Sequence, residues 1–361
     1  MKKVFIFLVS TCLLLTVFSS YVLAKANHPS TEGNTNISSI LTYDDMIKEL
    51  ESLEKRSKGK LVVETLEELG YENSKSEEGR DLYVAKIGKG PEKVWIQGRI
   101  HGNEPYGTEA TLELLKMYVS NQSPEIQKVL EELTLYVIPM YNPDGSEKNT
   151  RGNKDSIDLN RDWKKDGFEA VESLAWFTYW AEVKPDFGID IHHQGLKKDS
   201  QTGEAVTMSL GVSLAPGGPT LPGIKNGEYD EVTRQAQVYV YDSLKDYGYT
   251  NIDRYTTGNA RDGFTEIDIK GGVVSAMMLG LEYDGINEDN HSHPAVFFET
   301  SGNTRDGNLG QKARGHNIRH NVLGIQNLLY GLATGEVYDV NADRWDDIPR
   351  PDIKGYQTDY N

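Results

Sequence analysis

The stretch Val94–Glu104, VWIQGRIHGNE, decides how the chain folds, because an apolar run typical of a buried strand ends in polar residues. A helical pattern at Thr108–Val119 follows directly. A strand that passes through a short polar loop into a helix is a building unit of α/β folds. The stretch therefore predicts an α/β fold with polar side chains at the carboxyl end of a strand.

The same alternation of strands and helices continues on both sides of this stretch. Strands are expected at Leu82–Ile87, Leu133–Met140, Phe187–His192 and Val296–Glu299, and helices at 41–56, 168–183, 229–247 and 316–332. Strands separated by helices of this length predict a three-layer sandwich, in which helices flank a mixed central sheet.

The first residues have the layout of a secretory signal peptide. A short basic start precedes the apolar run 4–18, which is shorter than the roughly 20 residues that a membrane span needs. We expect cleavage after Ala24, with Ala26 as the second choice and a retained N-terminal anchor as the alternative. The protein is therefore expected to be secreted, to the extracellular space or the cell envelope, and its mature form to be soluble.

The rest of the chain predicts one folded domain. Residues 25–38 are polar and form an expected disordered lead-in, 39–336 form the domain, and 337–361 form a polar tail. Two long surface loops are expected at 197–230 and 280–294, without an assigned role. The lead-in leaves no room for an inhibitory prodomain, so we expect an enzyme that is active on secretion.

Cysteine use and charge exclude several classes of protein. The one cysteine, Cys12, lies in the predicted signal peptide, so disulfides, thiolate metal ligands and a cysteine nucleophile are excluded from the mature chain. The formal net charge is −17. This acidity argues against binding to nucleic acid or to an anionic membrane surface.

Histidines and a glutamate stand where two predicted strands end. Val94–Ile100 ends at His101, with Glu104 three residues on, and the strand from Phe187 ends at His192 and His193. Sites in open α/β sheets form beyond the carboxyl ends of the strands. Two imidazoles and a carboxylate suit Zn²⁺ and leave a fourth position for water. Adjacent strand residues point to opposite faces, so only one of the two histidines can be a ligand.

A series of motifs resembles the zinc carboxypeptidases, the carboxypeptidase A-like metallopeptidases, from about Tyr43 to about Gly335. The motifs are EGRDLYVAKIG (78–88), GRIHGNEPYGTEA (98–110), YNPDG (141–145), IDLNRDW (157–163) and FGIDIHH (187–193), followed by FFETSGN (297–303). The resemblance implies a zinc-dependent exopeptidase fold with one Zn²⁺ per chain. Its ligands would be His101, Glu104 and His192, since the family has an acidic or small residue two positions before the histidine, here Asp190.

The resemblance also implies roles for five further residues. Glu299 is expected to be the general base, and Arg151 to stabilise the oxyanion. Asn160 and Arg161 are expected to bind the terminal carboxylate of the substrate, and Asp158 to orient His101. Four of them have an ordinary structural alternative: a charged strand end for Glu299, a solvated turn for Arg151, and a helix-entry cap with its neighbour for Asn160 and Arg161.

The chain departs from the family in the region before Glu299. The tyrosine that assists catalysis in digestive members has no clear counterpart, and Tyr255 and Tyr283 are the candidates. The residue that sets side-chain preference lies in the same region and stays open.

The favoured interpretation is a monomeric, secreted zinc metallocarboxypeptidase that acts on peptides. A peptidase that cuts γ-D-glutamyl–diamino acid bonds in muropeptides is the alternative within the same chemistry. A non-catalytic zinc- or peptide-binding homologue is a third hypothesis.

Overall fold

The computed structural model describes residues 40–199, 201–212, 227–247, 250–267, 272–281, 291–302 and 311–357. The predicted signal peptide, the lead-in and large parts of the two predicted loops lie outside these residues. Two sheets and the helices around them make up the described part of the chain.

The elements follow one another in the order that the sequence predicts, with several more between them. The helices are α1 (Tyr43–Ser57), α2 (Tyr106–Ser120), α3 (Pro124–Glu132), α4 (Pro143–Lys148), α5 (Val171–Val183), α6 (Glu228–Leu244), α7 (Val273–Leu279) and α8 (Gln311–Thr334), with 3₁₀ turns η2 (Leu159–Arg161), η5 (Glu336–Asp339) and η6 (Ala342–Asp347). The strands are β1 (Leu61–Thr65), β2 (Tyr83–Gly88), β3 (Glu92–Gly98), β4 (Leu133–Ile138), β5 (Phe187–Gln194), β6 (Met208–Val212), β7 (Ile252–Arg254), β8 (Thr257–Asn259), β9 (Gly263–Ile267), β10 (Ala295–Ser301) and β11 (Ile353–Gln357).

The main sheet has eight strands in the order β1-β2-β4-β3-β5-β10-β6-β7. The four central strands β4, β3, β5 and β10 run parallel to one another. β1 and β2 at one side and β6 at the other side are antiparallel to their inner neighbours, which makes the sheet mixed. A second sheet of three strands has the order β11-β9-β8.

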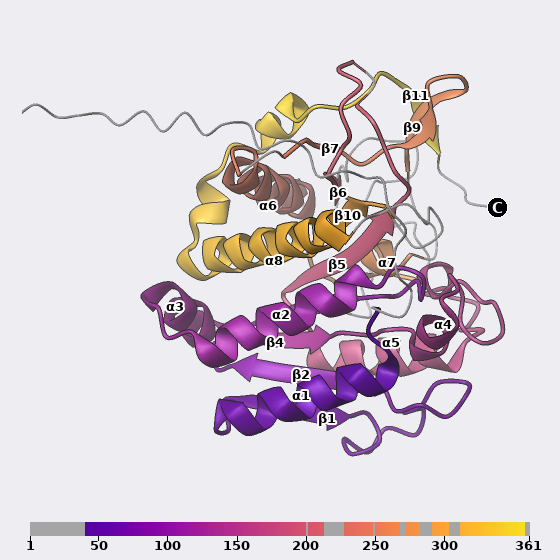
Figure 1. The fold of residues 1–361 in the computed structure, drawn as a ribbon, viewed down its shortest axis with the longest axis vertical. Coiled ribbons are helices and arrows are strands. Elements are labelled where there is room, and N and C mark those ends of the chain that lie inside the picture. The colour runs from indigo at the N-terminus through magenta and orange to yellow at the C-terminus, as the bar shows by residue number, and fades with distance from the viewer. Residues whose placement is uncertain are drawn as a thin grey trace, which may run out of the picture.

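Helices cover both faces of the main sheet, as Figure 1 shows, with α1, α2, α6 and α8 in front and α5 and α7 behind. The apolar side chains in front pack with those of the sheet into one core cluster. Those behind, including the tryptophans of α5, pack into a second cluster. The three-layer α/β sandwich with a mixed sheet is therefore confirmed.

Local sequence explains the central elements. All seven residues of β10, AVFFETS, are buried, because a strand covered by helices on both faces can carry apolar side chains on both sides. At the start of α1, the side chain of Thr42 accepts a hydrogen bond from the backbone of Asp45, whose carboxylate accepts one from Thr42 in return. This capping box fixes where the first helix begins.

The segment after Gly335, expected as a polar tail, packs against the domain as far as it is described. Val337, Trp345 and Ile348 are buried in the core, and β11 pairs in parallel with β9. A few apolar side chains among many aspartates anchor this segment, which its polar composition did not indicate.

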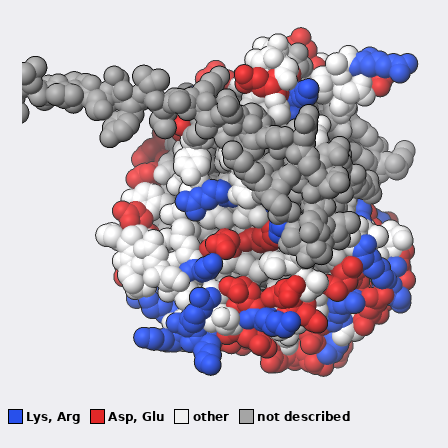
Figure 2. Space-filling model, viewed as in Figure 1, with Lys and Arg blue, Asp and Glu red and all other residues white. Residues whose placement is uncertain are grey.

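The surface of the described part carries charges of both signs. Figure 2 shows acidic side chains interspersed with basic ones over the half of the molecule that contains α1 and α2. Within the described residues, none of the helices combines the length and apolar character that a membrane crossing requires.

Candidate metal centre

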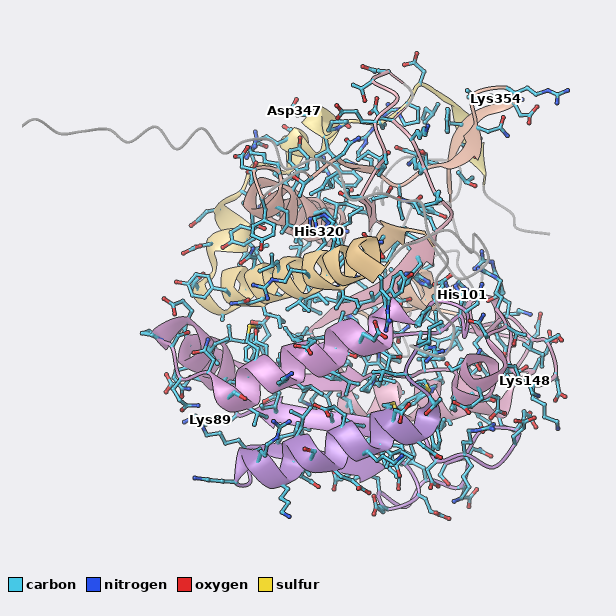
Figure 3. All side chains as sticks on the ribbon, in the orientation of Figure 1. Lys89, His101, Lys148, His320, Asp347 and Lys354 are labelled. Carbon is cyan, nitrogen blue, oxygen red and sulfur yellow. The ribbon has the colours of Figure 1, made fainter. Side chains whose placement is uncertain are left out.

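The predicted site residues meet beyond the carboxyl ends of the central parallel strands. β3 leads into the loop that carries His101 and Glu104, and β5 and β10 carry His192 and Glu299. Figure 3 shows His101 at this end of the sheet, next to the start of α2. Because parallel strands end at the same edge, residues far apart in the sequence come together there.

Three of these residues form a cluster that can hold a metal ion. Potential ligand atoms of His101, Glu104 and His192 all lie within 4.8 Å of one another, and all three residues are buried. The Glu104 carboxylate lies between the imidazoles, with Oε1 2.9 Å from Nδ1 of His101 and Oε2 3.1 Å from Nδ1 of His192. The sequence prediction of these three residues as one cluster is thus matched by their geometry.

The donor set fits a catalytic zinc ion. Zinc–ligand bonds of about 2.0–2.1 Å in a tetrahedron place ligand atoms about 3.4 Å apart, close to the spacing of these nitrogens and oxygens. Two neutral imidazoles and one carboxylate leave one position for water, as catalytic zinc sites do. Nδ1 of each histidine would face the metal, because both of these atoms converge on the same carboxylate.

The outer nitrogen of each histidine faces a further carboxylate. Nε2 of His101 lies 3.3 Å from Asp158, and Nε2 of His192 lies 2.9 Å from Asp190. Such carboxylates hold a metal-binding imidazole in one tautomer and orientation. Burial alone would lower the pKa of His192, but Asp190 and Glu104 outweigh it and raise the pKa. Burial would likewise raise the pKa of Glu104, but the two imidazoles outweigh it and hold that pKa well below its usual value.

His193 points away from this cluster, as strand alternation requires. Its ring packs on Tyr106, with the ring centroids 4.2 Å apart, while its backbone N–H donates to Glu104. Burial lowers the pKa of His193 to about 3, so the ring is neutral. The ring of His192 is therefore the one that joins His101 and Glu104.

Glu299 lies beside His192, because these residues face each other in the register of β10 and β5. The side chain lines the same cleft as the metal cluster, although the residue is only 9% exposed. Burial, together with the nearby Glu104 carboxylate and against the pull of His192, raises the pKa of Glu299 to about 8. A carboxylate of high proton affinity next to a metal cluster can accept and return a proton.

Arg151 contributes a cation at the edge of the cluster. Its Nε donates to Asp158 over 2.8 Å, and its Nη1 lies 3.3 Å from Nδ1 of His101. Burial favours the neutral form of Asp158, but His101, Arg151 and Arg161 outweigh it and hold the pKa of this carboxyl below its usual range. Asp158 therefore stays ionised and joins the arginine to the first histidine.

The turn η2 brings Asn160 and Arg161 to the same cleft. Asn160 is 4% exposed; its Oδ1 accepts from the backbone of Val273, and its Nδ2 lies 3.4 Å from Nε2 of His192. Arg161 donates to the backbone oxygen of Asn160. The amide is thus held firmly between α7 and His192, with the guanidinium next to it.

The cleft around these residues has a volume of about 1130 Å³. Its floor includes Phe297, whose ring meets that of Tyr255 edge to face with centroids 5.2 Å apart. Gly211 makes room for this floor, since a Cβ atom there would lie 2.0 Å from the ring of Phe297. Of the two tyrosine candidates, Tyr255 lines the cleft and Tyr283 lies outside the described residues.

Three residues that support the site were not assigned a role from the sequence. Asp190 holds His192, and its signal was its position two residues earlier on the same strand, which puts both side chains on one face. Asn142 caps α4 and donates to the backbone oxygens of Ile100 and Arg151.

Arg99 is the third of these residues, and it is 1% exposed. Its guanidinium donates to the backbone oxygens of Gly102, Leu41 and Ser146. No sequence pattern marks Arg99, because its partners are carbonyl groups from three separate segments.

Comparisons with known proteins agree with this geometry. The fold is that of metallo-carboxypeptidases: a metallo-carboxypeptidase from Burkholderia cenocepacia superimposes with a TM-score of 0.57 at 18% identity, over 83% of this chain and 70% of that chain. Carboxypeptidase A from Helicoverpa armigera gives a TM-score of 0.55 at 17% identity, over 84% of this chain and 77% of that chain.

Sequence similarity extends over a shorter region. The family model described as zinc carboxypeptidase matches residues 70–176. Carboxypeptidase 2 of Trichophyton equinum is 35% identical over 130 residues, which are 33% of this chain and 24% of that protein. Carboxypeptidase SOL1 of Arabidopsis thaliana is 31% identical over 142 residues, 37% of this chain and 28% of that protein. Residues 70–176 thus resemble the zinc carboxypeptidase family in sequence, the chain spans about a quarter of the length of these curated relatives, and the fold is shared with metallo-carboxypeptidases.

Proposed function

We propose that the protein is a secreted zinc metallocarboxypeptidase that removes residues from the C-termini of peptides. One observation carries the proposal: the cluster of His101, Glu104 and His192 shares one cleft with a buried glutamate and two arginines. The match of residues 70–176 to the zinc carboxypeptidase model supports the reaction class, and the apolar start of the sequence supports secretion.

His101 and His192 would each hold one zinc ion through Nδ1, and Glu104 would hold the same ion through a carboxylate oxygen. Bound zinc would supply Lewis acidity, which makes a water molecule more acidic and polarises the carbonyl of the scissile peptide bond. Asp190 holds the imidazole of His192 in the required tautomer through a hydrogen bond to Nε2, and Asp158 faces Nε2 of His101 over 3.3 Å from the corresponding side.

Glu299 is the proposed general base. Its buried carboxylate lies next to His192, where it takes the proton of the attacking water and delivers it to the leaving amine. Arg151 is the proposed donor to the oxyanion, since its guanidinium is fixed by Asp158 beside the metal cluster. Glu299 would approach the reacting carbonyl from strand β10, and Arg151 from the loop after α4.

Asn160 and Arg161 are proposed to bind the free carboxylate at the end of the substrate. The planar guanidinium of Arg161 can donate to both oxygens of a carboxylate, and the amide of Asn160 is held beside it. This pair favours cleavage of the last peptide bond over cleavage inside a chain.

Replacing Glu299 with Gln tests the proposal. The variant should keep one zinc ion per chain, measured by metal analysis, and lose about 10²–10⁴-fold in kcat, the usual contribution of a general base. The same peptide with a C-terminal amide serves as the matched substrate control and should be cut far more slowly than the free acid. Turnover by Glu299→Gln at the rate of the parent enzyme would refute the role of Glu299.

A panel of substrates defines the class of peptide. Peptides with apolar, basic or acidic last residues should be trimmed one residue at a time, while muropeptides with γ-D-glutamyl–diamino acid bonds stay intact. The opposite outcome would reassign the protein to the muropeptide reaction. Zinc-loaded protein that cuts neither substrate class would indicate a binding protein.

A further inference from the structure

The row of polar side chains that contains His192 and Glu299 continues across two more strands of the sheet. His192 faces Glu299, Glu299 faces Ser209 on β6, and Ser209 faces Asp253 on β7. Residues paired in this way across neighbouring strands point to the same face of a sheet. Ser209 and Asp253 therefore extend the catalytic face beyond the proposed base.

Hydrogen bonds connect this extension to Glu299. The amide of Gln194, at the end of β5, donates to Oγ of Ser209 over 2.6 Å and to the backbone oxygen of Glu299 over 3.2 Å. The hydroxyl of Ser209 donates in turn to the carboxylate of Asp253. Asp253 is 2% exposed and lies too deep to meet the substrate directly.

Lys197 covers this buried carboxylate. Its Nζ lies 2.7 Å from Oδ2 of Asp253 and donates to Oγ1 of Thr256 over 3.2 Å. The side chains of Lys197 and Asp253 are only 12% and 2% exposed. The ammonium group thus joins three segments: its own loop, β7, and the linker between β7 and β8.

These segments carry one side of the cleft, which we call the outer wall. The outer wall consists of residues 195–199 and Gly203 between β5 and β6, and of residues 255–260 and Phe264 around β8 and β9. In Figure 1 the segment between β5 and β6 rises from the carboxyl end of β5 toward β9 and β11. Backbone hydrogen bonds from Val206 to Lys197 and from Asp199 to Glu204 close this segment into a hairpin.

We propose that Lys197 and Asp253 are positioning residues, whose buried ion pair holds both parts of the outer wall against the sheet beside Glu299. Removing one partner of a buried ion pair leaves an uncompensated charge, so the pair resists separation. The polar partners of Lys197 and Asp253 are each other, Thr256 and Ser209, which lie outside the metal cluster. The pair therefore acts on substrate binding through the wall, and this consequence for substrate rests on the proposed peptidase function.

Hydrogen exchange of the backbone amides tests the pair without using activity. Lys197→Met and Asp253→Asn each remove one charge at nearly constant size. Each should speed exchange in residues 196–206 and 255–260 by about tenfold or more, with α2 and α8 unchanged. Lys197→Arg keeps the charge and should retain most of the protection.

The matched control is Lys75→Met, which breaks a lysine–aspartate pair of similar length, 2.6 Å, whose partners are 39% and 33% exposed. Pairs as exposed as this one contribute little, so exchange in the outer wall should not change. The double variant Lys197→Met/Asp253→Asn should resemble the single variants, because each alone already breaks the same link.

Kinetics and metal content complete the experiment. The Lys197→Met variant should bind zinc as the parent does and should raise KM for a peptide by about tenfold, with kcat changed less than about threefold. Unchanged exchange in the outer wall would overturn the positioning role, whatever the activity. Faster exchange in a protein that cuts no peptide would keep the positioning role and refute the proposed function.

Discussion

Replacing Asp190 with Asn should weaken zinc binding, because this carboxylate holds the outer side of a proposed metal ligand. Asp190 is 1% exposed, and its Oδ2 lies 2.9 Å from Nε2 of His192. Its second oxygen has no hydrogen-bond partner among the described residues. The carboxylate is thus committed to the imidazole, and the substitution changes this contact above all others.

The size of the effect follows from the type of hydrogen bond. A hydrogen bond to a charged group contributes about 1.5–3 kcal/mol, and a neutral one about 0.5–1.5 kcal/mol. In Asp190→Asn the new amide oxygen could still accept from Nε2–H of His192, so the substitution should cost about 1 kcal/mol, or about fivefold in the dissociation constant for zinc. Asp190→Ala removes the acceptor entirely and should cost about 10–100-fold, the usual range for partners of metal ligands.

Competition with a chromophoric chelator measures the dissociation constant at fixed pH. The expected order of affinity is parent, then Asp190→Asn, then Asp190→Ala. Asp246→Asn, at an exposed position after α6, is the control and should bind zinc as the parent does. Equal zinc affinity of the parent and all three variants would refute the reasoning. A loss of affinity in Asp246→Asn as large as in the Asp190 variants would refute it too.

Three further predictions concern stability and the loop that carries the ligands. Burial and two nearby carboxylates raise the pKa of Glu92 to about 7, so its ionisation opposes folding. As pH rises, the carboxyl group of Glu92 ionises at lower pH in the unfolded chain than in the folded protein, so the folded state loses stability relative to the unfolded one. Glu92→Gln should therefore stabilise the protein by about 1–3 kcal/mol at pH 8 and hardly at pH 4.5 in thermal unfolding. A stabilisation independent of pH would contradict this reasoning. Phe298→Ala in the centre of β10, where the side chain is 0% exposed, should cost about 3–5 kcal/mol in urea unfolding. The control Val62→Ala, at a 41% exposed position, should change the free energy of unfolding by less than about 0.5 kcal/mol. Similar losses for Phe298→Ala and Val62→Ala would contradict the prediction. Arg99→Met removes the donor to Gly102 between the two ligands of the loop and should weaken zinc binding by about tenfold in the chelator assay, and unchanged affinity would argue against a role of this arginine.

The sequence predicted the strongly patterned elements well. The expected helix at Thr108–Val119 is α2, Tyr106–Ser120, and the expected strand at Leu133–Met140 is β4, Leu133–Ile138. The apolar residues recur at helical spacing in α2 and fill almost all of β4, because both elements pack against the core. Short elements such as β1 and β6 were not predicted, since neither has the unbroken run of four apolar residues that marks the start of β10.

The sequence by itself determined the chemistry available at the proposed metal site. It placed His101, Glu104 and His192 at the ends of strands, and strand alternation required that His192 and His193 point to opposite faces. These are local properties, in which residue type and strand period decide what a side chain can do.

Only the tertiary structure decided which distant residues support that chemistry. Asp253 and Ser209 join the row of Glu299 because β7 and β6 lie beside β10, and Lys197 reaches Asp253 from a hairpin 56 positions earlier in the sequence. A buried charge needs its partner close in space, and closeness across a sheet depends on strand order and register. Neither strand order nor register is set by the period of any one segment.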